Sequence, residues 1–384
     1  TMLYTFRRQT VLSAALTFCT FAAVAQNAVQ TKYTNSSVYT GIEVGSKGVK
    51  MSIIEIGKNA QSTGAFNILK DTSVNTDFIS FSPSTFAATL EGLTGLYNKA
   101  TRELKIPGKK VFTVISSGVK MQAEKENKSA HVKALIDSFR LRIGEPEKMV
   151  EVVDVMQEAR LSHLGIVPDK RRFTTFLIDI GSGNTKGGFF PDGSSTGNFK
   201  LFELNWGTKS TFNETQKRCE GDMSMPNFNK NLGRVLLNAE NADIIYAVNA
   251  SGAYPLSDNI AVSGGIAWST ATLLHPELID NPVISITFDE LVKFNEKLAN
   301  NFSAYSADFL VSTINNAADK ERAKAEILRV HKVFDQKSLM SGAGLLWKIM
   351  RQFESAFETK HFYLVKNGSV GWVSAYVDQT ISGN

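Results

Sequence analysis

The sequence has little cysteine and histidine and, beyond its N-terminus, no long apolar segment. Only Cys19 and Cys219 occur among 384 residues, which excludes a disulfide framework and a thiolate metal cluster. The five histidines are scattered and form no HxxxH or HExxH pair, which argues against a histidine-rich zinc site. After the N-terminus no apolar run approaches the ~20 residues of a membrane span, so a polytopic membrane protein is excluded.

The chain also lacks a strong excess of charge of either sign. The chain has 42 Lys and Arg against 37 Asp and Glu, a formal net charge of +5. No dense basic run with interleaved aromatics appears, so nucleic acid is not an expected partner. A small positive charge suits an anionic ligand, and equally an ordinary soluble surface. The length and composition predict a globular chain of two domains or more.

The N-terminus has the pattern of a secretory signal peptide over residues 1–25. Arg7 and Arg8 precede an uncharged apolar stretch that ends in Ala23-Val24-Ala25, a small-x-small cleavage signal. This pattern predicts a secreted or periplasmic protein with no membrane attachment after cleavage. An uncleaved membrane anchor stays open, as does a lipoprotein signal at Cys19.

Two strand–turn–strand units repeat along the chain, at 38–56 and 173–190. When Glu43 is aligned with Asp179, 136 positions later, both units read acid, aliphatic residue, Gly, Ser, three residues, Lys. An internal duplication is the economical explanation, and it predicts two similar lobes.

The turn of each unit has a chemical use. Glycine lets the backbone approach a ligand closely, and consecutive N–H groups in such a turn form an anion-binding nest. Ser46 and Ser182 add hydroxyl donors, whereas Lys50 and Lys186 could contact a ligand or be ordinary strand lysines. An acid that ends an apolar strand is out of place unless it binds a cation or positions water. Two such turns facing one cleft would clamp a phosphate chain.

Further strands and helices alternate between and after these units. Residues 111–120 predict a strand ending in a small polar loop, and 151–165 predict a strand running into a short helix. This helix begins near Glu158, which would face whatever lies above the sheet, or be an exposed helix glutamate. Residues 260–270 predict a buried strand, a Gly-Gly turn and a helix whose N-terminal amides favour anions. The alternation indicates an α/β chain with mixed sheets.

The C-terminal third predicts mainly helices. Residues 291–302 and 320–331 have amphipathic helical spacing. Residues 335–353 predict a small-residue loop, with Ser341-Gly342-Ala343-Gly344-Leu345-Leu346 in it, that leads into a helix.

This order of motifs resembles the actin-like ATPase superfamily and, within it, the exopolyphosphatase/guanosine pentaphosphate phosphatase family. Residues 43–46 resemble the motif D-x-G-S-N, and 179–184 resemble D-I-G-G-G-S. Residues 157–165 resemble E-E-A-x-L-x-x-x-G, and 341–346 the late P-G-L-x-x-L segment. The resemblance extends from about Val38 to Trp372, nearly all of the expected mature chain.

The resemblance implies a two-lobed actin-like (ribonuclease H-like) ATPase fold with mixed sheets flanked by helices. Lobe I would span 26–165 and lobe II 166–384, with a C-terminal helix that packs back on lobe I. Glu158 would be the catalytic base that activates water, and Glu43 and Asp179 would hold Mg²⁺. The implied phosphate-binding residues are Gly45, Ser46, Lys47, Ser117, Lys120, Gly181, Ser182, Gly183, Asn184, Gly264 and Gly265.

The sequence departs from the family's motifs at several of these positions. Glu43 stands for the usual Asp, Lys120 for Arg, and Gln157 for the first Glu of its pair. Ser182 and Asn184 replace Gly and Ser. The Lys at position 120 lacks the bidentate fork of an arginine.

The resulting prediction is a phosphohydrolase that cleaves terminal phosphoanhydride bonds of polyphosphate or a similar substrate. Two alternatives stay open, an extracytoplasmic nucleotidase of the apyrase type and a non-catalytic actin-like protein that binds a phosphorylated ligand. A homodimer also stays open, because the sequence does not settle the oligomeric state.

Overall fold

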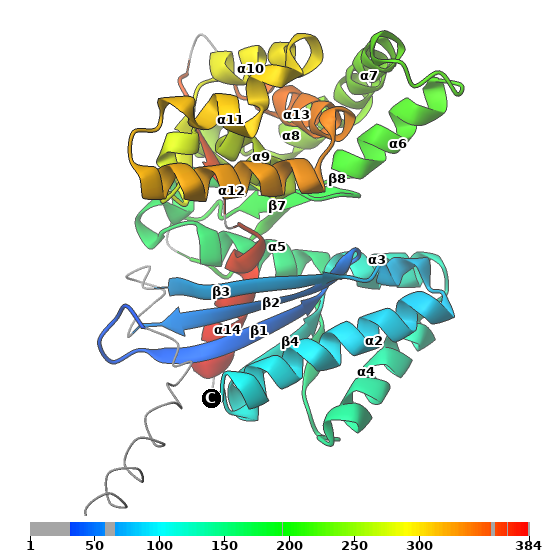
Figure 1. The fold of residues 1–384 in the computed structure, drawn as a ribbon, viewed down its shortest axis with the longest axis vertical. Coiled ribbons are helices and arrows are strands. Elements are labelled where there is room, and N and C mark those ends of the chain that lie inside the picture. Colours follow the sequence, from blue (N-terminus) through cyan, green and yellow to red (C-terminus); the bar gives the residue numbers. More distant parts are fainter. Residues whose placement is uncertain (1–30, 58–65, 194, 355–357, 367, 383–384) are drawn as a thin grey trace, which may run out of the picture.

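The computed structural model describes residues 31–57, 66–193, 195–354, 358–366 and 368–382. The predicted signal peptide at 1–25 lies outside these residues. Across the described ranges, none of the helices has both the length and the hydropathy of a membrane span. The described residues form two α/β lobes stacked along the long axis of the molecule (Figure 1).

Lobe I is built on a five-stranded sheet with the order β3-β2-β1-β4-β5. Its strands are β1 (Ser37–Val44), β2 (Gly48–Ile56), β3 (Phe66–Asn75), β4 (Val111–Ile115) and β5 (Val150–Val152). The first three are antiparallel neighbours, and β4 and β5 run parallel to β1. The helices α2 (Pro83–Asn98), α3 (Ser117–Lys125) and α4 (Ser129–Ile143) bury their apolar faces on one side of the sheet.

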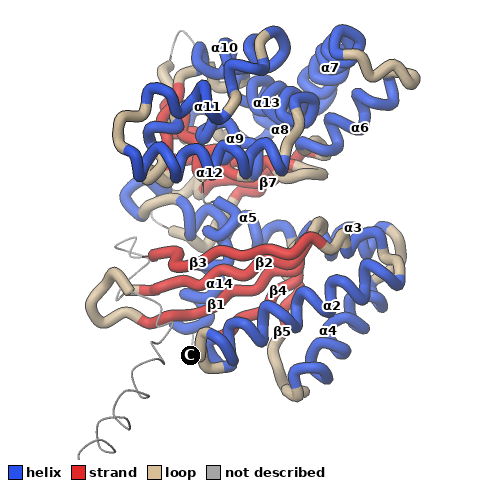
Figure 2. The backbone as a smooth tube through the Cα atoms, viewed as in Figure 1, coloured by secondary structure: helices blue, strands red, loops and turns tan. Residues whose placement is uncertain are grey.

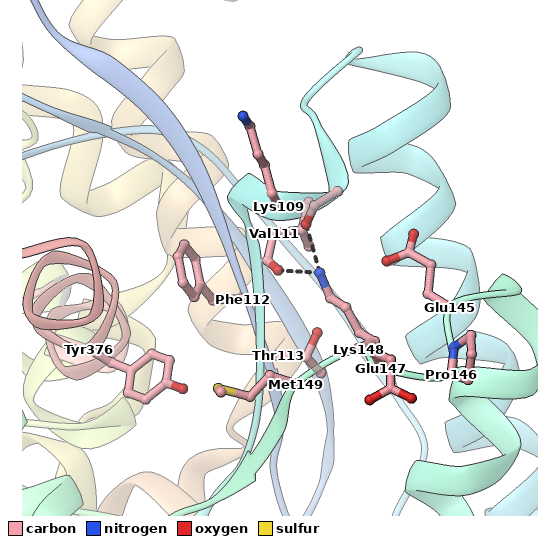
Figure 3. Close-up of a pocket in the computed structure, with 11 residues that line it drawn as sticks. Lys109, Val111, Phe112, Thr113, Glu145, Pro146, Glu147, Lys148, Met149 and Tyr376 are labelled. Carbon is pink, nitrogen blue, oxygen red and sulfur yellow. Dashed lines mark hydrogen bonds between the residues drawn. The ribbon is translucent and has the colours of Figure 1, made fainter. Parts of the chain in front are cut away.

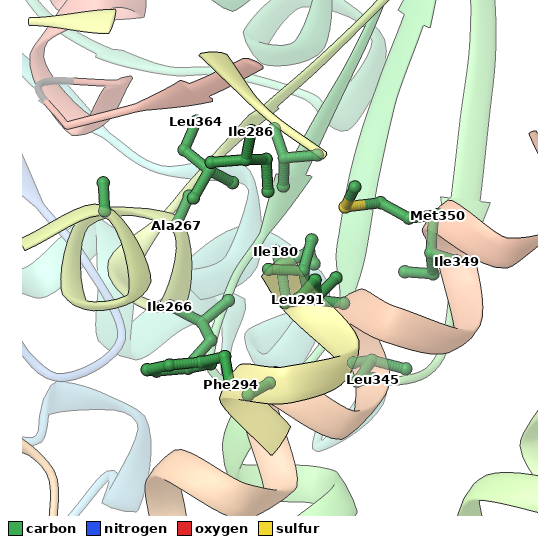
Figure 4. Packing of buried hydrophobic residues seen from close by; sticks show 14 of the residues in the cluster. Ile180, Ile266, Ala267, Ile286, Leu291, Phe294, Leu345, Ile349, Met350 and Leu364 are labelled. Carbon is green, nitrogen blue, oxygen red and sulfur yellow. The ribbon is translucent and has the colours of Figure 1, made fainter. Parts of the chain in front are cut away.

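Lobe II is built on a six-stranded sheet with the order β10-β11-β9-β6-β7-β8. Its strands are β6 (Thr175–Ile180), β7 (Thr185–Phe189), β8 (Lys200–Leu204), β9 (Asn259–Ser263), β10 (Val283–Ile286) and β11 (His361–Val365). Its helices are α6 (Thr208–Arg218), α7 (Met225–Ala239), α8 (Ile245–Ser251), α9 (Gly265–Leu274), α10 (Phe288–Asn300), α11 (Ala307–Leu310), α12 (Ala317–Val333) and α13 (Gln336–Arg351). Ile180, Ile266 and Leu345 meet in the core between this sheet and α9, α10 and α13 (Figure 4).

Short helical turns connect the main elements. The 3₁₀ turns are Phe78–Ser80, Gly108–Lys110, Asp169–Thr174, Tyr254–Leu256, Pro276–Leu278, Phe302–Tyr305 and Val311–Thr313, and the π-helical turns are Lys99–Glu103 and Glu240–Ile244.

The two lobes repeat one strand arrangement, which Figure 2 shows as two separate sheets. In each lobe three antiparallel strands are followed by helices and by a strand parallel to the first. Glu43 pairs with Lys50 across the first hairpin, and Asp179 pairs with Lys186 at the same register across the second. The turns close alike, through a 2.9 Å bond from the N–H of residue 45 or 181 to the carbonyl of residue 48 or 184.

Two helices lie on the other face of the lobe I sheet, α5 (Val155–Ile166) and the C-terminal α14 (Gly368–Ser382). They cross in close contact because both carry glycine at the crossing. A Cβ atom on Gly165 would stand 1.9 Å from the Gly371 carbonyl oxygen, and one on Gly41 of β1 would stand 2.0 Å from Val373 Cγ1. The C-terminal helix therefore packs back on the sheet of lobe I.

Two local predictions differ from the structure. Residues 341–346 are not a loop, since they lie inside α13, where Gly342 and Gly344 let Ile266 and Leu236 approach closely. The polar loop expected after the strand at 111–115 is also absent, because α3 already begins at Ser117.

Candidate active site

A cleft of about 1260 Å³ lies between the two lobes, and both repeated turns line it. Most of the predicted site residues are at its surface. These are Glu43, Gly45, Ser46, Lys47, Glu158, Asp179, Gly181, Ser182, Gly183, Asn184, Gly264 and Gly265. The fold thus brings residues from both halves of the sequence to one site.

The second turn is held in place by the start of α6. The N–H of Thr208 donates to the Gly181 carbonyl at 3.0 Å, and that of Lys209 donates to the Ser182 carbonyl at 2.7 Å. Gly207 precedes this helix, and a Cβ atom there would meet the turn backbone at 2.7 Å. Only glycine therefore allows α6 to start against the turn, and the first amides of α6 are directed at the carbonyls of that turn.

The N-terminus of α9 also reaches the cleft. Gly264 has φ +100°, in the left-handed region, and a Cβ atom there would lie 2.2 Å from the Ile180 carbonyl oxygen. This conformation turns β9 directly into α9, so the first amides of α9 lie beside the second turn. Helix N-termini of this kind favour phosphate groups.

Glu158 is buried at the floor of the cleft, with 4% of its surface exposed, and is not an exposed helix residue. It lies in the first turn of α5, whose N-cap Asp154 accepts a bond from the N–H of Gln157 at 2.7 Å. The N–H of Ser117 donates to Glu158 Oε2 at 2.8 Å. The ammonium of Lys186 pairs with Glu158 Oε1 at 2.5 Å. Glu158 therefore joins α3 of lobe I to β7 of lobe II.

Charge on this cluster follows from burial and from its neighbours. Burial alone would raise the pKa of Glu158, but the Lys186 charge and the bonds from Lys186 and Ser117 outweigh it and lower that pKa. Burial would lower the pKa of Lys186, yet the charges of Glu158 and Asp179 raise it. Burial raises the pKa of Glu43, with Lys50 acting against it. At neutral pH Glu158 and Lys186 thus form a charged pair, which weakens Glu158 as a proton acceptor.

The two residues expected to hold Mg²⁺, Glu43 and Asp179, share their surroundings with the ammonium group of Lys186. Among the described residues, no three acidic, histidine or cysteine side chains are grouped closely enough to ligate one. The buried Lys186 ammonium interacts with Glu43, Glu158 and Asp179, so a positive charge already lies among the carboxylates. The Ser263 hydroxyl donates to Asp179 Oδ1 at 2.9 Å.

At the rim of the cleft, two lysines from opposite lobes face each other. Lys47 of the first turn forms a 2.5 Å ion pair with Asp77. Side-chain contact with the Lys47 ammonium group, then partial burial and the Lys47 charge, lower the pKa of Lys209. Two like charges held across a cleft attract an anion that can bind both. Sequence reasoning missed Lys209, because nothing local places residue 209 opposite residue 47.

Two predicted phosphate ligands lie elsewhere. Ser117 is buried behind Glu158, to which its N–H donates. Lys120 does not line the cleft, because α3 is helical from Ser117 and presents another face. That face carries Gly118, Met121, Gln122 and Lys125, with the spacing i, i+3, i+4, i+7 of one helix stripe.

A second hollow of about 510 Å³ lies in lobe I beside β4, and none of the predicted site residues line it (Figure 3). One of its two lysines has a structural role, since Lys148 Nζ donates to the carbonyls of Gly108 and Val111, both at 2.7 Å. The cleft between the lobes is therefore the candidate site.

Comparisons with solved structures agree with this architecture. No family model and no curated protein matches the sequence. A Ppx/GppA family member from Aquifex aeolicus is 16% identical, with a TM-score of 0.62 over 91% of this chain and 99% of that one. An exopolyphosphatase from Cytophaga hutchinsonii is 14% identical, with a TM-score of 0.54 over 89% of this chain and 98% of that one. The chain therefore has the two-lobed actin-like fold of the Ppx/GppA proteins, as its motif order predicts.

Proposed function

We propose that the cleft binds the end of a polyphosphate chain, or of a similar phosphorylated compound, and that the protein hydrolyses its terminal phosphoanhydride bond. The observation that carries this proposal is the pair of equivalent Gly-Ser turns, one from each lobe, that line a single cleft. Backbone amides of such turns bind phosphate oxygens. The lysines at 47, 50, 186 and 209 line the same cleft and supply the opposite charge.

Hydrolysis needs a water in line with the terminal phosphorus and a carboxylate that accepts the water's proton. Glu158 is the candidate for that carboxylate, because it is buried at the cleft floor and ionised. Its pair with Lys186 lowers its basicity, so turnover by this route is expected to be slow. The two turns would contribute by fixing the phosphates.

The test is phosphate release from tripolyphosphate, long-chain polyphosphate and ATP by wild type and Glu158→Gln. The substitution keeps the size of the side chain, replaces one of its two acceptor oxygens with a donor NH₂, and removes its basicity. Turnover should fall by about 10²–10⁴-fold, whereas Glu91→Gln on the exposed face of α2 should leave it unchanged. Activity of Glu158→Gln within threefold of wild type rejects Glu158 as the base.

One observation favours a second candidate function, non-catalytic binding of a phosphorylated ligand. Both oxygens of Glu158 are already engaged, one by Lys186 and one by Ser117. A carboxylate held in this way is poorly placed to take a proton from water. Binding of tripolyphosphate by wild type, with phosphate release no faster than the uncatalysed rate without protein, would establish this function instead.

A further inference from the structure

One ammonium group at the floor of the cleft, that of Lys186, contacts the carboxylate of Glu158 and lies within the electrostatic influence of two further carboxylates. The Lys186 side chain is 11% exposed, and its charge interacts with Glu158, Asp179 and Glu43. Its Nζ lies 2.5 Å from Glu158 Oε1 and 3.4 Å from the Ser117 hydroxyl. Buried carboxylates repel one another unless they are protonated or share a cation. Here the cation belongs to the chain itself.

The sheet fixes the position of this ammonium. Lys186 belongs to β7, every residue of which is buried, and it pairs with Asp179 on β6. The preceding residue is anchored, since the Thr185 hydroxyl donates to the Trp206 carbonyl at 2.7 Å. Lys186 is therefore set on a rigid element and not on a loop, and its charge stays among the carboxylates.

We propose that the Lys186 ammonium is the resident cation of this cleft, in the place that a divalent metal ion would otherwise fill, and that phosphate chains bind here without one. The first part stands apart from the proposed function, and the second rests on it. A divalent ion among these carboxylates would face the ammonium and be repelled. Lys47 and Lys209 at the rim supply further positive charge for the phosphates.

The decisive variant is Lys186→Met, which keeps an unbranched side chain one atom shorter than lysine and removes its charge. The charges of Glu43, Glu158 and Asp179 then lack their shared counter-ion. The variant should therefore attract a hydrated divalent ion, held through its water shell and not by three direct ligands. Millimolar Mg²⁺ or Ca²⁺ should raise its Tm by about 3 °C or more through binding to the folded state. The Tm of wild type and of Lys186→Arg should not respond to these ions or to EDTA.

Lys348→Met is the matched control. Lys348 is likewise buried in lobe II and paired with one carboxylate, Glu240, at 2.8 Å. Its loss removes one of the two cations bound to Glu240, since Arg351 also pairs with that carboxylate at 2.6 Å, and should lower the Tm. Added Mg²⁺ should not restore the Tm, because the single carboxylate of Glu240 keeps its other partners. A rise in Tm with Mg²⁺ that occurs in Lys186→Met and not in Lys348→Met therefore shows that the ion binds near the carboxylates of Glu43, Glu158 and Asp179.

Calorimetric titration of wild type with tripolyphosphate in excess EDTA tests the second part. Binding in EDTA is expected, and binding that requires added Mg²⁺ overturns it. A wild-type Tm that rises with Mg²⁺, or a Lys186→Met variant that folds and ignores Mg²⁺, overturns the resident-cation assignment. If Lys186→Met does not fold, the metal responses of wild type and Lys186→Arg still decide. Failure of wild type to bind tripolyphosphate under any condition rejects the proposed function and leaves the metal-response result standing.

Discussion

At the scale of single residues, His163 links the fold to pH. It is fully buried on α5, its ring meets the edges of Phe190 and Phe199, and its Nε2 is bonded to the Thr175 carbonyl at 2.9 Å. Burial lowers the pKa of His163 to about 4, although the bond to Thr175 acts in the other direction.

This shift predicts a loss of stability in mild acid. Between pH 6.5 and 4 the unfolded chain takes up a proton at His163 that the folded chain does not. The contribution of His163 to the free energy of unfolding is therefore fully present above about pH 6.5. It falls by about 3 kcal/mol as the pH drops to 4. His163→Gln should give a flatter profile of unfolding free energy over this range, measured by urea denaturation. If the unfolding free energy of the variant falls with pH as steeply as that of wild type, groups other than His163 cause the loss of stability.

Some residues of the candidate site could be predicted from the sequence, and others could not. The two turns were predictable because their acid, glycine and serine follow one another within a few positions. The partner of Glu158 was not predictable, because Lys186 is 28 positions away and meets it only when α5 packs against β7. Lys209 and Lys125 were missed for the same reason, since each depends on where a helix begins and which face it presents.

At the scale of elements, local sequence patterns were enough to predict the two hairpins but not the helix α13. Alternating apolar residues around a Gly-Ser turn specify two paired strands. The small residues at 341–346 indicate a loop by propensity, yet they form a helix because Gly342 and Gly344 fit against Ile266 and Leu236 of neighbouring helices. Tertiary packing here outweighs the low helix propensity of glycine.

The crossing of α5 and α14 provides a test at this scale. Gly165→Ala places a Cβ atom 1.9 Å from the Gly371 carbonyl oxygen, and backbone cannot yield cheaply. The Tm should fall by several degrees, because the two helices must separate or shift. Gly233→Ala in α7 is the matched control, since its Cβ would meet nothing within 4 Å, and it should stabilise by about 0.5–1 kcal/mol. Equal Tm values for the two variants would mean that the crossing is loose.

At the scale of the whole molecule, the duplication turns one anion-binding turn into a two-sided clamp. Each lobe repeats the same strand order and the same turn bond, and α5 carries Glu158 from one lobe to a lysine of the other. The motif order was enough to predict two lobes and this fold. The motif order did not predict the balance of charge inside the cleft, because that balance depends on distances between side chains of the two lobes.

The central claim is that both lobes hold one phosphate chain, and calorimetric titration with tripolyphosphate tests it most directly. Wild type should bind one chain per molecule. Lys47→Met in lobe I and Lys209→Met in lobe II should each weaken binding by about tenfold, the loss of one charged hydrogen bond. Lys217→Met, on the exposed side of α6, should not change it. Loss of affinity in the variant of one lobe only, or no binding by wild type, would contradict the claim.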